Sequence, residues 1–157
     1  MTHQNGEHFH KNKVHHILAH SYAVYFVLFL AAVFLDTIFH FSIFPDSVLM
    51  PLGFFFLVLA SIMIVWAQKT GRDLRKVAEV KTEHFGRGPY HYTRIPTQWG
   101  LFFLLLGFGV IANAFFVVLS TIISLFIFRF VFMKKHDQYL VDRYGDAYKE
   151  YKKSVRF

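Results

Sequence analysis

Side chains that can bind an anion or accept a proton are concentrated in two stretches of the sequence. Residues 88–100 contain Arg94 among Pro, Tyr and Thr residues, and residues 134–148 contain the adjacent pair His136 and Asp137. A guanidinium binds carboxylates and lipid phosphates, and an imidazole or a carboxylate can serve as a proton acceptor. An uncharged apolar block separates the two stretches, so any joint chemistry depends on the elements that bring them together.

Those elements are predicted to be membrane-spanning helices. Hydrophobic residues make up 55% of the 157 residues, and 21 residues are Phe, which is more apolar surface than a small soluble domain can bury. Residues 47–68 and 95–128 contain no charge, and about 20 apolar residues cross a bilayer as a helix. The sequence therefore predicts an all-α integral membrane bundle.

Four spans are predicted. One straight helix over residues 95–128 would be about 50 Å long, well above the bilayer core of about 30 Å. Gly107, Gly109 and Asn113 lie near its middle, so this block is expected to form a hairpin. Pro45 and Asp46 indicate a turn at residues 44–47. The predicted organisation is a polar tail followed by a single membrane domain: tail 1–16; domain 17–157; spans 17–39, 47–66, 97–111 and 114–133; polar segments 67–96 and 134–157.

The net charge of +7 points to a lipid partner rather than to nucleic acid. Lys and Arg residues cluster in segments 67–96 and 134–157, whereas the two predicted turns carry none. The positive-inside rule then places both termini and the middle segment in the cytoplasm. The short chain without an organelle address favours a bacterial inner membrane.

A metal site is not expected. The chain has no Cys, which excludes disulfides and thiolate ligands. The N-terminal tail could offer imidazoles to a divalent metal, but nothing fixes their geometry and a solvated tail is favoured; these residues are His3, His8, His10, His15 and His16. Asp36 and His40 are four residues apart near the end of the first span, so they either pair on one helical face or reach the non-cytoplasmic surface.

The C-terminal segment is predicted to lie as a helix at the membrane surface. Tyr144, Tyr148 and Tyr151 share one helical face, where packing or interfacial anchoring is their expected role. Gly145 is expected to break or bend this helix.

Several short motifs follow one another in a characteristic order. The chain reads Gly-Pro-Tyr at residues 88–90 and Arg-Ile-Pro-Thr-Gln-Trp-Gly at 94–100, and then comes the apolar hairpin. His-Asp follows at 136–137, and Tyr-Gly-Asp-Ala-Tyr at 144–148 leads to Val-Arg-Phe at the end. Over roughly residues 85–157, this order resembles the isoprenylcysteine carboxyl methyltransferase and phospholipid N-methyltransferase superfamily of membrane enzymes.

The resemblance implies a methyltransferase that uses S-adenosylmethionine. Its acceptor would be a lipophilic small molecule or lipid that bears an amine, a thiol or a carboxylate and enters from the bilayer. His136 and Asp137 take the positions of the family's acidic pair and would be the catalytic residues, because an amine acceptor must lose a proton. Arg94 would offer a bidentate donor to the cofactor carboxylate. The cofactor pocket would be formed by Gly88, Pro89, Tyr90, Arg94, Pro96, Gln98, Gly100 and Asp137.

The chain also departs from the family pattern. Ile95 replaces a His, Gln98 replaces a Tyr, and His136 replaces the first acidic residue. The second acidic residue is shortened to Asp137, and the Pro before the final Arg is absent. These departures support the main alternative, a catalytically degenerate member that acts as a membrane lipid-binding or interaction protein.

Other interpretations remain open. Residues 88–100 could be a re-entry turn with aromatic anchors, and Arg94 could hold a lipid phosphate. An NADPH-dependent membrane reductase is a further enzymatic alternative, since membrane sterol reductases have a similar C-terminal architecture, although this chain is shorter and has fewer spans. A transporter or channel subunit is disfavoured, because the spans are expected to lack the buried polar residues that it would need.

Overall fold

The computed structural model describes residues 3–44, 49–76 and 87–155, and for residues 3–18, 74–76 and 143 it describes the backbone alone. Within these ranges the chain forms helices and no strand. The elements are α1 (His3–Phe39), α2 (Met50–Lys76), the 3₁₀-helix η2 (Gly88–His91), α4 (Pro96–Ile111), α5 (Phe115–Ile127), the π-helix η3 (Phe128–Phe132), α6 (Met133–Tyr144) and α7 (Asp146–Ser154).

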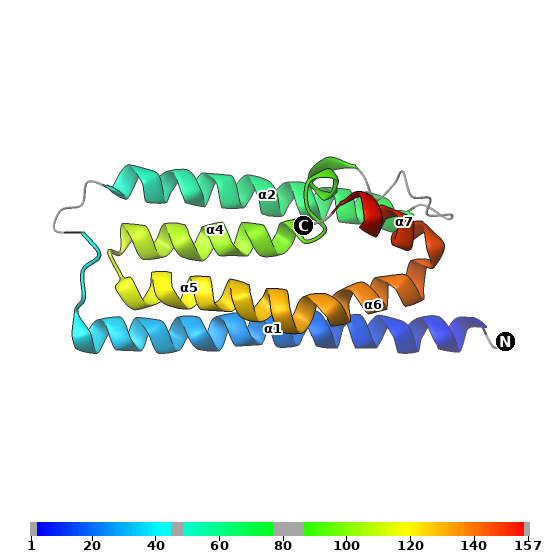
Figure 1. Cartoon of the computed structure of the whole chain (residues 1–157), viewed down its shortest axis with the longest axis horizontal. Helices are drawn as coiled ribbons and strands as arrows, with labels where there is room; N and C mark the ends of the chain where they lie inside the picture. The colour runs from blue at the N-terminus through cyan, green and yellow to red at the C-terminus, as the bar shows by residue number, and fades with distance from the viewer. Residues whose placement is uncertain (1–2, 45–48, 77–86, 156–157) are drawn as a thin grey trace.

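The four long elements lie side by side as a row in the order α2, α4, α5, α1 (Figure 1). Among the residues that the structure describes, three helical stretches are long and apolar enough to cross a membrane, namely Ala19–Phe39, Met50–Asp73 and Phe115–Asp142. The shorter apolar helix α4 lies between two of them. The protein is therefore an all-α, multi-pass membrane bundle, which confirms the predicted fold class.

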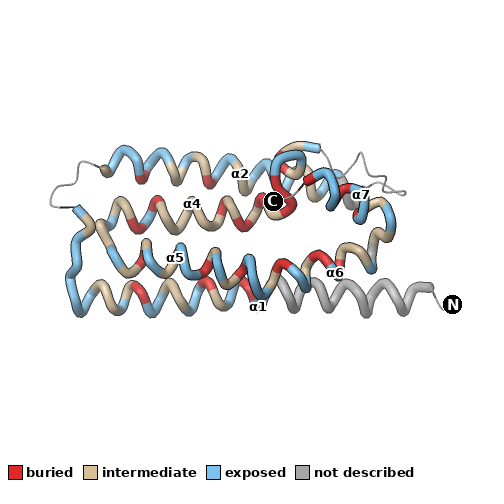
Figure 2. The backbone as a smooth tube through the Cα atoms, viewed as in Figure 1, coloured by how far each residue is buried: buried red, intermediate tan, exposed pale blue. Residues whose placement is uncertain are grey.

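The outer surface of the bundle is apolar. Large hydrophobic side chains are exposed along the edge helices of the row, including Phe26 and Phe34 on α1 and Phe54, Phe55 and Val58 on α2. Exposed positions accordingly recur along these helices (Figure 2). Contiguous apolar surface of this extent would be a liability in water, and it suits contact with lipid chains.

Glycines allow α2 and α4 to pack closely. A Cβ atom on Gly107 would lie 2.8 Å from the carbonyl oxygen of Gly53, and one on Gly53 would lie 2.9 Å from the carbonyl oxygen of Gly107. A Cβ on Gly100 would lie 2.5 Å from Cγ1 of Ile64. Small residues that bring backbones together are typical of helix pairs in membranes, where no hydrophobic effect drives association.

Short polar side chains are buried on α1 and α5 within the bundle. Ser21, Thr121 and Ser124 are all at least 98% buried, and the Thr121 hydroxyl donates to the Val117 carbonyl at 2.8 Å. The expectation that the spans lack buried polar residues is therefore wrong. Small hydroxyl residues are common in membrane helix interfaces because they pack closely and satisfy their own hydrogen bonds within the helix.

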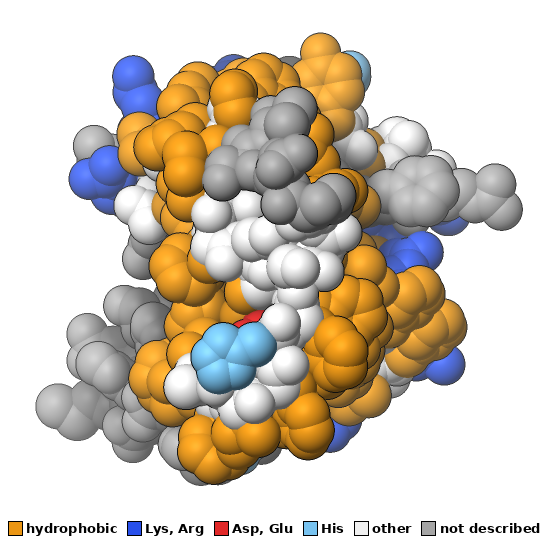
Figure 3. Space-filling view, turned by 90° about the vertical axis from the view of Figure 1, so that its left-hand side faces the viewer, with side chains coloured by type: hydrophobic (Ala, Val, Ile, Leu, Met, Phe, Trp, Pro, Cys, Tyr) orange, Lys and Arg blue, Asp and Glu red, His pale blue; other side chains and the backbone are white. Residues whose placement is uncertain are grey.

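Two side chains join the connections at one end of the row, which we call the turn end (residues 40–44 and 112–114). Asn113, at a φ of +52°, accepts hydrogen bonds from the backbone N–H groups of Ile43 and Phe44 at 2.9 and 3.1 Å. The Asp36 carboxylate accepts from the N–H groups of Phe116 and Val117 at 3.0 and 2.9 Å. Figure 3 looks onto this end and shows mainly hydrophobic side chains and backbone, with Lys and Arg only beyond its margins.

Asp36 thus has a role that the sequence did not suggest. It caps the N-terminus of α5, where unpaired N–H groups and the helix dipole favour a carboxylate. Neither expectation for this residue, a pair with His40 or a side chain that reaches the surface, describes this contact. The predicted turn at residues 44–47 falls largely outside the described residues, which resume at Leu49.

Helix boundaries differ from the predicted ones in three places. The segment predicted as a polar tail is helical from His3 onward, and α2 continues ten residues beyond the predicted end of its span, to Lys76. α5, η3 and α6 follow one another without a break, so the C-terminal segment starts as an extension of the last span. The predicted hairpin is confirmed, since α4 ends at Ile111 and α5 begins at Phe115.

Candidate functional site

The two polar stretches meet at the opposite end of the row, which we call the basic end (η2, residues 92–95, the first turn of α4, α6 and α7). Figure 1 shows α6 curving away from the row and α7 folding back beside η2 and the start of α4. Residues that are separated by the whole apolar hairpin therefore come into contact here.

The conformation of residues 88–96 places Arg94 at this end. Gly88 has a φ of +62°, and a Cβ there would lie 2.6 Å from the Thr70 hydroxyl oxygen, so only glycine fits between η2 and α2. Thr93 accepts a hydrogen bond from the N–H of Ile95 at 3.3 Å, and Pro96 then starts α4, where its missing N–H costs nothing.

Arg94 and Asp137 form a buried ion pair. The Nη1 atom of Arg94 lies 2.7 Å from Oδ2 of Asp137, and the two residues are only 8% and 5% exposed. The short distance is typical of a charge-assisted hydrogen bond. Two of the predicted cofactor-binding residues therefore touch each other directly, across 43 positions of sequence.

Helix α7 contributes two further groups to Asp137. The Tyr148 hydroxyl donates to Oδ1 of Asp137 at 2.9 Å, and Nζ of Lys152 lies 3.0 Å from Oδ2. Tyr148 and Lys152 are four residues apart and so share one face of α7. Gly145, at a φ of +60°, ends α6 and reverses the chain direction, which confirms the predicted break.

A tyrosine cluster supports this arrangement. The Tyr151 hydroxyl donates to the carbonyl oxygen of Tyr90 in η2, and Tyr148 and Tyr151 are almost fully buried with Val155. Burial raises the pKa of both the Tyr148 and the Tyr151 hydroxyls, and the nearby Asp137 carboxylate raises them further. Both hydroxyls therefore remain protonated donors at neutral pH.

Two predicted site residues, Gln98 and His136, have buried polar atoms without a hydrogen-bond partner. Both amide atoms of Gln98, which is 3% exposed, are unpaired, and so is Nδ1 of the partly buried His136. Gln98 lies eleven positions before Gly109 on the same helical face, and Gly109 faces Val117 and Val118 of α5. The Gln98 amide is thus directed toward α5 rather than toward α2. Buried polar groups are nearly always paired in native proteins, so these atoms can form hydrogen bonds with a water molecule or with a polar ligand.

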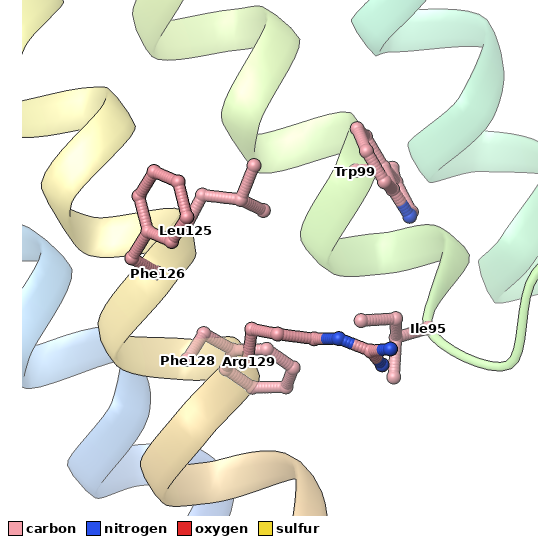
Figure 4. Close-up of a pocket in the computed structure, with 6 residues that line it drawn as sticks. All are labelled: Ile95, Trp99, Leu125, Phe126, Phe128 and Arg129. Carbon is pink, nitrogen blue, oxygen red and sulfur yellow. The ribbon is translucent and has the colours of Figure 1, made fainter. Parts of the chain in front are cut away.

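An apolar cavity of about 240 Å³ lies between the start of α4 and the junction of α5 with η3 (Figure 4). It is lined by Ile95, Trp99, Leu125, Phe126, Phe128 and Arg129. The Arg129 side chain extends across toward Ile95, while Trp99 and Leu125 lie at the other side of the cavity. Nη1 of Arg129 donates to the sulfur of Met133.

The predicted site residues fall into three groups. Arg94 and Asp137 are in contact, and Tyr90 joins them through Tyr151. Gln98 and His136 contribute unpaired polar atoms. The remaining four shape the backbone or the packing rather than present polar side chains: Gly88, Pro89, Pro96 and Gly100. Gly100 in particular packs against Ile64 and Ala60 of α2.

Sequence reasoning missed Lys152 and Arg129. The four-residue spacing of Tyr148 and Lys152 could have placed both side chains on one helical face. That this face points toward Asp137 depends on the chain reversal at Gly145, which the spacing does not predict. Arg129 is the only charge in the predicted span 114–133, and a charged residue inside a span is a functional candidate in itself.

No protein-family model, characterised protein or solved structure matches the chain.

Proposed function

We propose that the protein is a membrane-bound methyltransferase that uses S-adenosylmethionine and acts on a lipophilic acceptor. The observation that supports this proposal most is the contact between Arg94 and Asp137 at 2.7 Å. It joins the two stretches on which the resemblance to the isoprenylcysteine and phospholipid methyltransferases rests. The buried, unpaired amide of Gln98, in the first turn of α4, adds a group that a polar ligand would satisfy.

The residues at the basic end fit the polar parts of the cofactor. Arg94 and Lys152 provide two positive charges against the single carboxylate of Asp137, so the cluster retains an excess positive charge that suits the carboxylate of a methionine moiety. Gln98 can both donate and accept hydrogen bonds, and His136 Nδ1 offers one more polar contact. Bound S-adenosylmethionine supplies an electrophilic methyl group. An acceptor amine would lose its proton to His136, whose buried ring nitrogen has no partner in the protein.

The position of the site suits an acceptor that arrives from the bilayer. The basic end is next to three helices that are long and apolar enough to cross a membrane, so the chemistry takes place at one membrane surface. We propose that this surface is cytoplasmic, since the Lys and Arg residues gather here and avoid the turn end. We further propose a bacterial inner membrane as the location and an amine, thiol or carboxylate as the accepting group.

Titration calorimetry of S-adenosylmethionine into the detergent-purified protein tests the proposal. We expect the wild-type chain to bind and Arg94→Ala to bind roughly 10- to 100-fold more weakly, because a hydrogen bond between charged groups contributes about 1.5–3 kcal/mol. Asp146→Asn is the matched control. It removes a carboxylate from an ion pair with Lys149, but this pair is exposed on the far face of α7, so binding should not change.

A second candidate function is non-catalytic lipid binding by a degenerate family member. The observation in its favour is that Asp137 already has three partners within the protein: Arg94, Tyr148 and Lys152. Such a carboxylate can be purely structural. Absence of S-adenosylmethionine binding at millimolar concentration, in protein shown to be folded by thermal unfolding, would reject the methyltransferase and leave this candidate.

A further inference from the structure

We infer that the cavity between α4 and the α5–η3 junction is a binding site for one anionic bilayer phospholipid, with an acyl chain in the cavity and the phosphate on Arg129. This inference stands apart from the proposed activity. A lipid such as phosphatidylglycerol bears no amine, thiol or carboxylate that could accept a methyl group. Its evidence is the shape, polarity and depth of the cavity.

The cavity has the size and chemistry of an acyl-chain site. Its volume of about 240 Å³ is slightly below the range of about 300–1,000 Å³ in which whole small-molecule ligands usually bind. Five of its six lining residues are hydrophobic, and neither Arg129 nor the Trp99 indole has a side-chain acceptor, so the cavity suits an acyl chain better than a polar nucleoside. Phe126 lines the cavity and is also exposed on the outer surface of the bundle, so the cavity is continuous with the face that contacts lipid.

Charge is present at one end of the cavity only. Arg129 extends toward Ile95, which directly precedes the first turn of α4, whereas Trp99 and Leu125 lie nearer the turn end (Figure 4). The cavity is therefore cationic toward the basic end of the bundle and apolar toward its middle. A phospholipid in the adjacent leaflet has the same polarity, with its phosphate at the surface and its chain toward the bilayer centre.

The depth of Arg129 also suits a headgroup. It lies fourteen residues from the start of α5, about 21 Å from the turn end at 1.5 Å per residue. Within a hydrocarbon core of about 30 Å, the long side chain can reach the far interface, as arginines near the ends of spans do. The π-helix η3 contains Arg129, and such π-bulges are frequent at functional sites because they redirect side chains within a helix.

The two tryptophans of the chain allow a test with an internal control. Trp99 lines the cavity between α4 and the α5–η3 junction, whereas Trp66 is 45% exposed on α2, an edge helix of the row. The variant Trp66→Phe reports on the cavity, and Trp99→Phe reports on ordinary lipid contact. Each would be reconstituted into vesicles that contain phosphatidylglycerol or phosphatidylcholine with brominated chains, which quench tryptophan on contact.

In Trp66→Phe, we expect brominated phosphatidylglycerol to quench Trp99 at a roughly tenfold lower mole fraction than brominated phosphatidylcholine. A tenfold preference corresponds to about 1.4 kcal/mol, which one charge-assisted hydrogen bond from Arg129 to the phosphate can provide. Adding Arg129→Gln should remove this preference, and Arg129→Lys should retain part of it. Trp66 should show no preference. Equal quenching of Trp99 by both lipids, or a preference that survives Arg129→Gln, would overturn the inference.

A second measurement does not depend on any variant. Lipid extracted from the detergent-purified wild-type protein would be quantified by mass spectrometry against the membrane from which it came. We expect phosphatidylglycerol or another anionic phospholipid to be enriched, at about one molecule per chain. Co-purified lipid with the composition of the bulk membrane would contradict the site.

Discussion

Replacement of Gln98 by Leu should make the protein more stable and, at the same time, a poorer binder of S-adenosylmethionine. Both side-chain amide atoms of Gln98 are buried without a partner. An unpaired buried amide costs about 1–3 kcal/mol by protein mutational data, and a leucine of similar size removes this cost. The free energy of unfolding should therefore rise by an amount of that order, and the thermal midpoint in detergent should rise with it.

Added S-adenosylmethionine should reduce the difference in stability between Gln98→Leu and the wild type. A ligand at 100 times its dissociation constant stabilises the state that binds it by about 2.7 kcal/mol. The wild-type midpoint should therefore increase clearly when S-adenosylmethionine is added, whereas Gln98→Leu should show a smaller increase. Gln138→Leu provides the control, because Gln138 is an amide on α6 outside the buried network, and a surface change of this kind usually alters stability by less than about 0.5 kcal/mol.

Two results would refute this reasoning in different ways. A loss of stability of about 1 kcal/mol or more in Gln98→Leu would show that the amide is hydrogen-bonded in the folded protein, since removal of a satisfied buried partner costs that much. A gain in stability with an unchanged response to S-adenosylmethionine would show that the unpaired amide is not a cofactor contact.

Three further predictions concern the bundle and the tyrosine cluster. Gly107→Ala should destabilise the protein by about 1–3 kcal/mol through overpacking against α2, whereas Gly71→Ala, whose Cβ would meet only an ordinary contact at 3.6 Å, should be neutral or stabilising in thermal unfolding. Asp36→Ala should cost about 0.5–2 kcal/mol in the same assay, because it removes the cap of α5; no change would mean that the cap is replaceable. Because burial raises the pKa of Tyr148, its contribution to stability is complete below the unfolded value of about 10 and is lost as pH rises beyond it. Absorbance at alkaline pH should accordingly show that the Tyr148 hydroxyl, identified as the signal lost in Tyr148→Phe, ionises only well above its unfolded value, and ionisation at or below that value would contradict this.

The helical hairpin could be predicted because its signal is local. A run of residues without charge that is too long for one span, with two glycines and an asparagine near its middle, has few other solutions in a bilayer. The helical conformation of residues 3–16 was not predicted, because these residues carry no local signal for a helix. Residues 3–16 have no apolar face, but a helix that already exists at Ala19 extends into them without the cost of a new nucleus.

The site was predictable in part. The order of motifs predicts that Arg94 and Asp137 lie close together, and the two side chains are in contact. The role of Gly100 was not deducible, because a glycine in a motif can serve a ligand or a neighbouring helix, and only the distance to Ile64 decides between them. The Asp36 cap was equally hidden, since its partners are 80 and 81 residues further along the chain.

The order of helices across the row has a consequence for how the protein is assembled. α1 and α2 are synthesised first, yet they lie at opposite edges of the row, with α4 and α5 between them. The native interface of each helix therefore forms only after the later hairpin has entered the membrane. α2 packs against the glycine face of α4, and α1 packs against α5, whose N-terminus Asp36 caps. The first two spans must consequently persist as separate helices in lipid, and the exposed Phe residues along both of them suit that interval as well as the finished bundle.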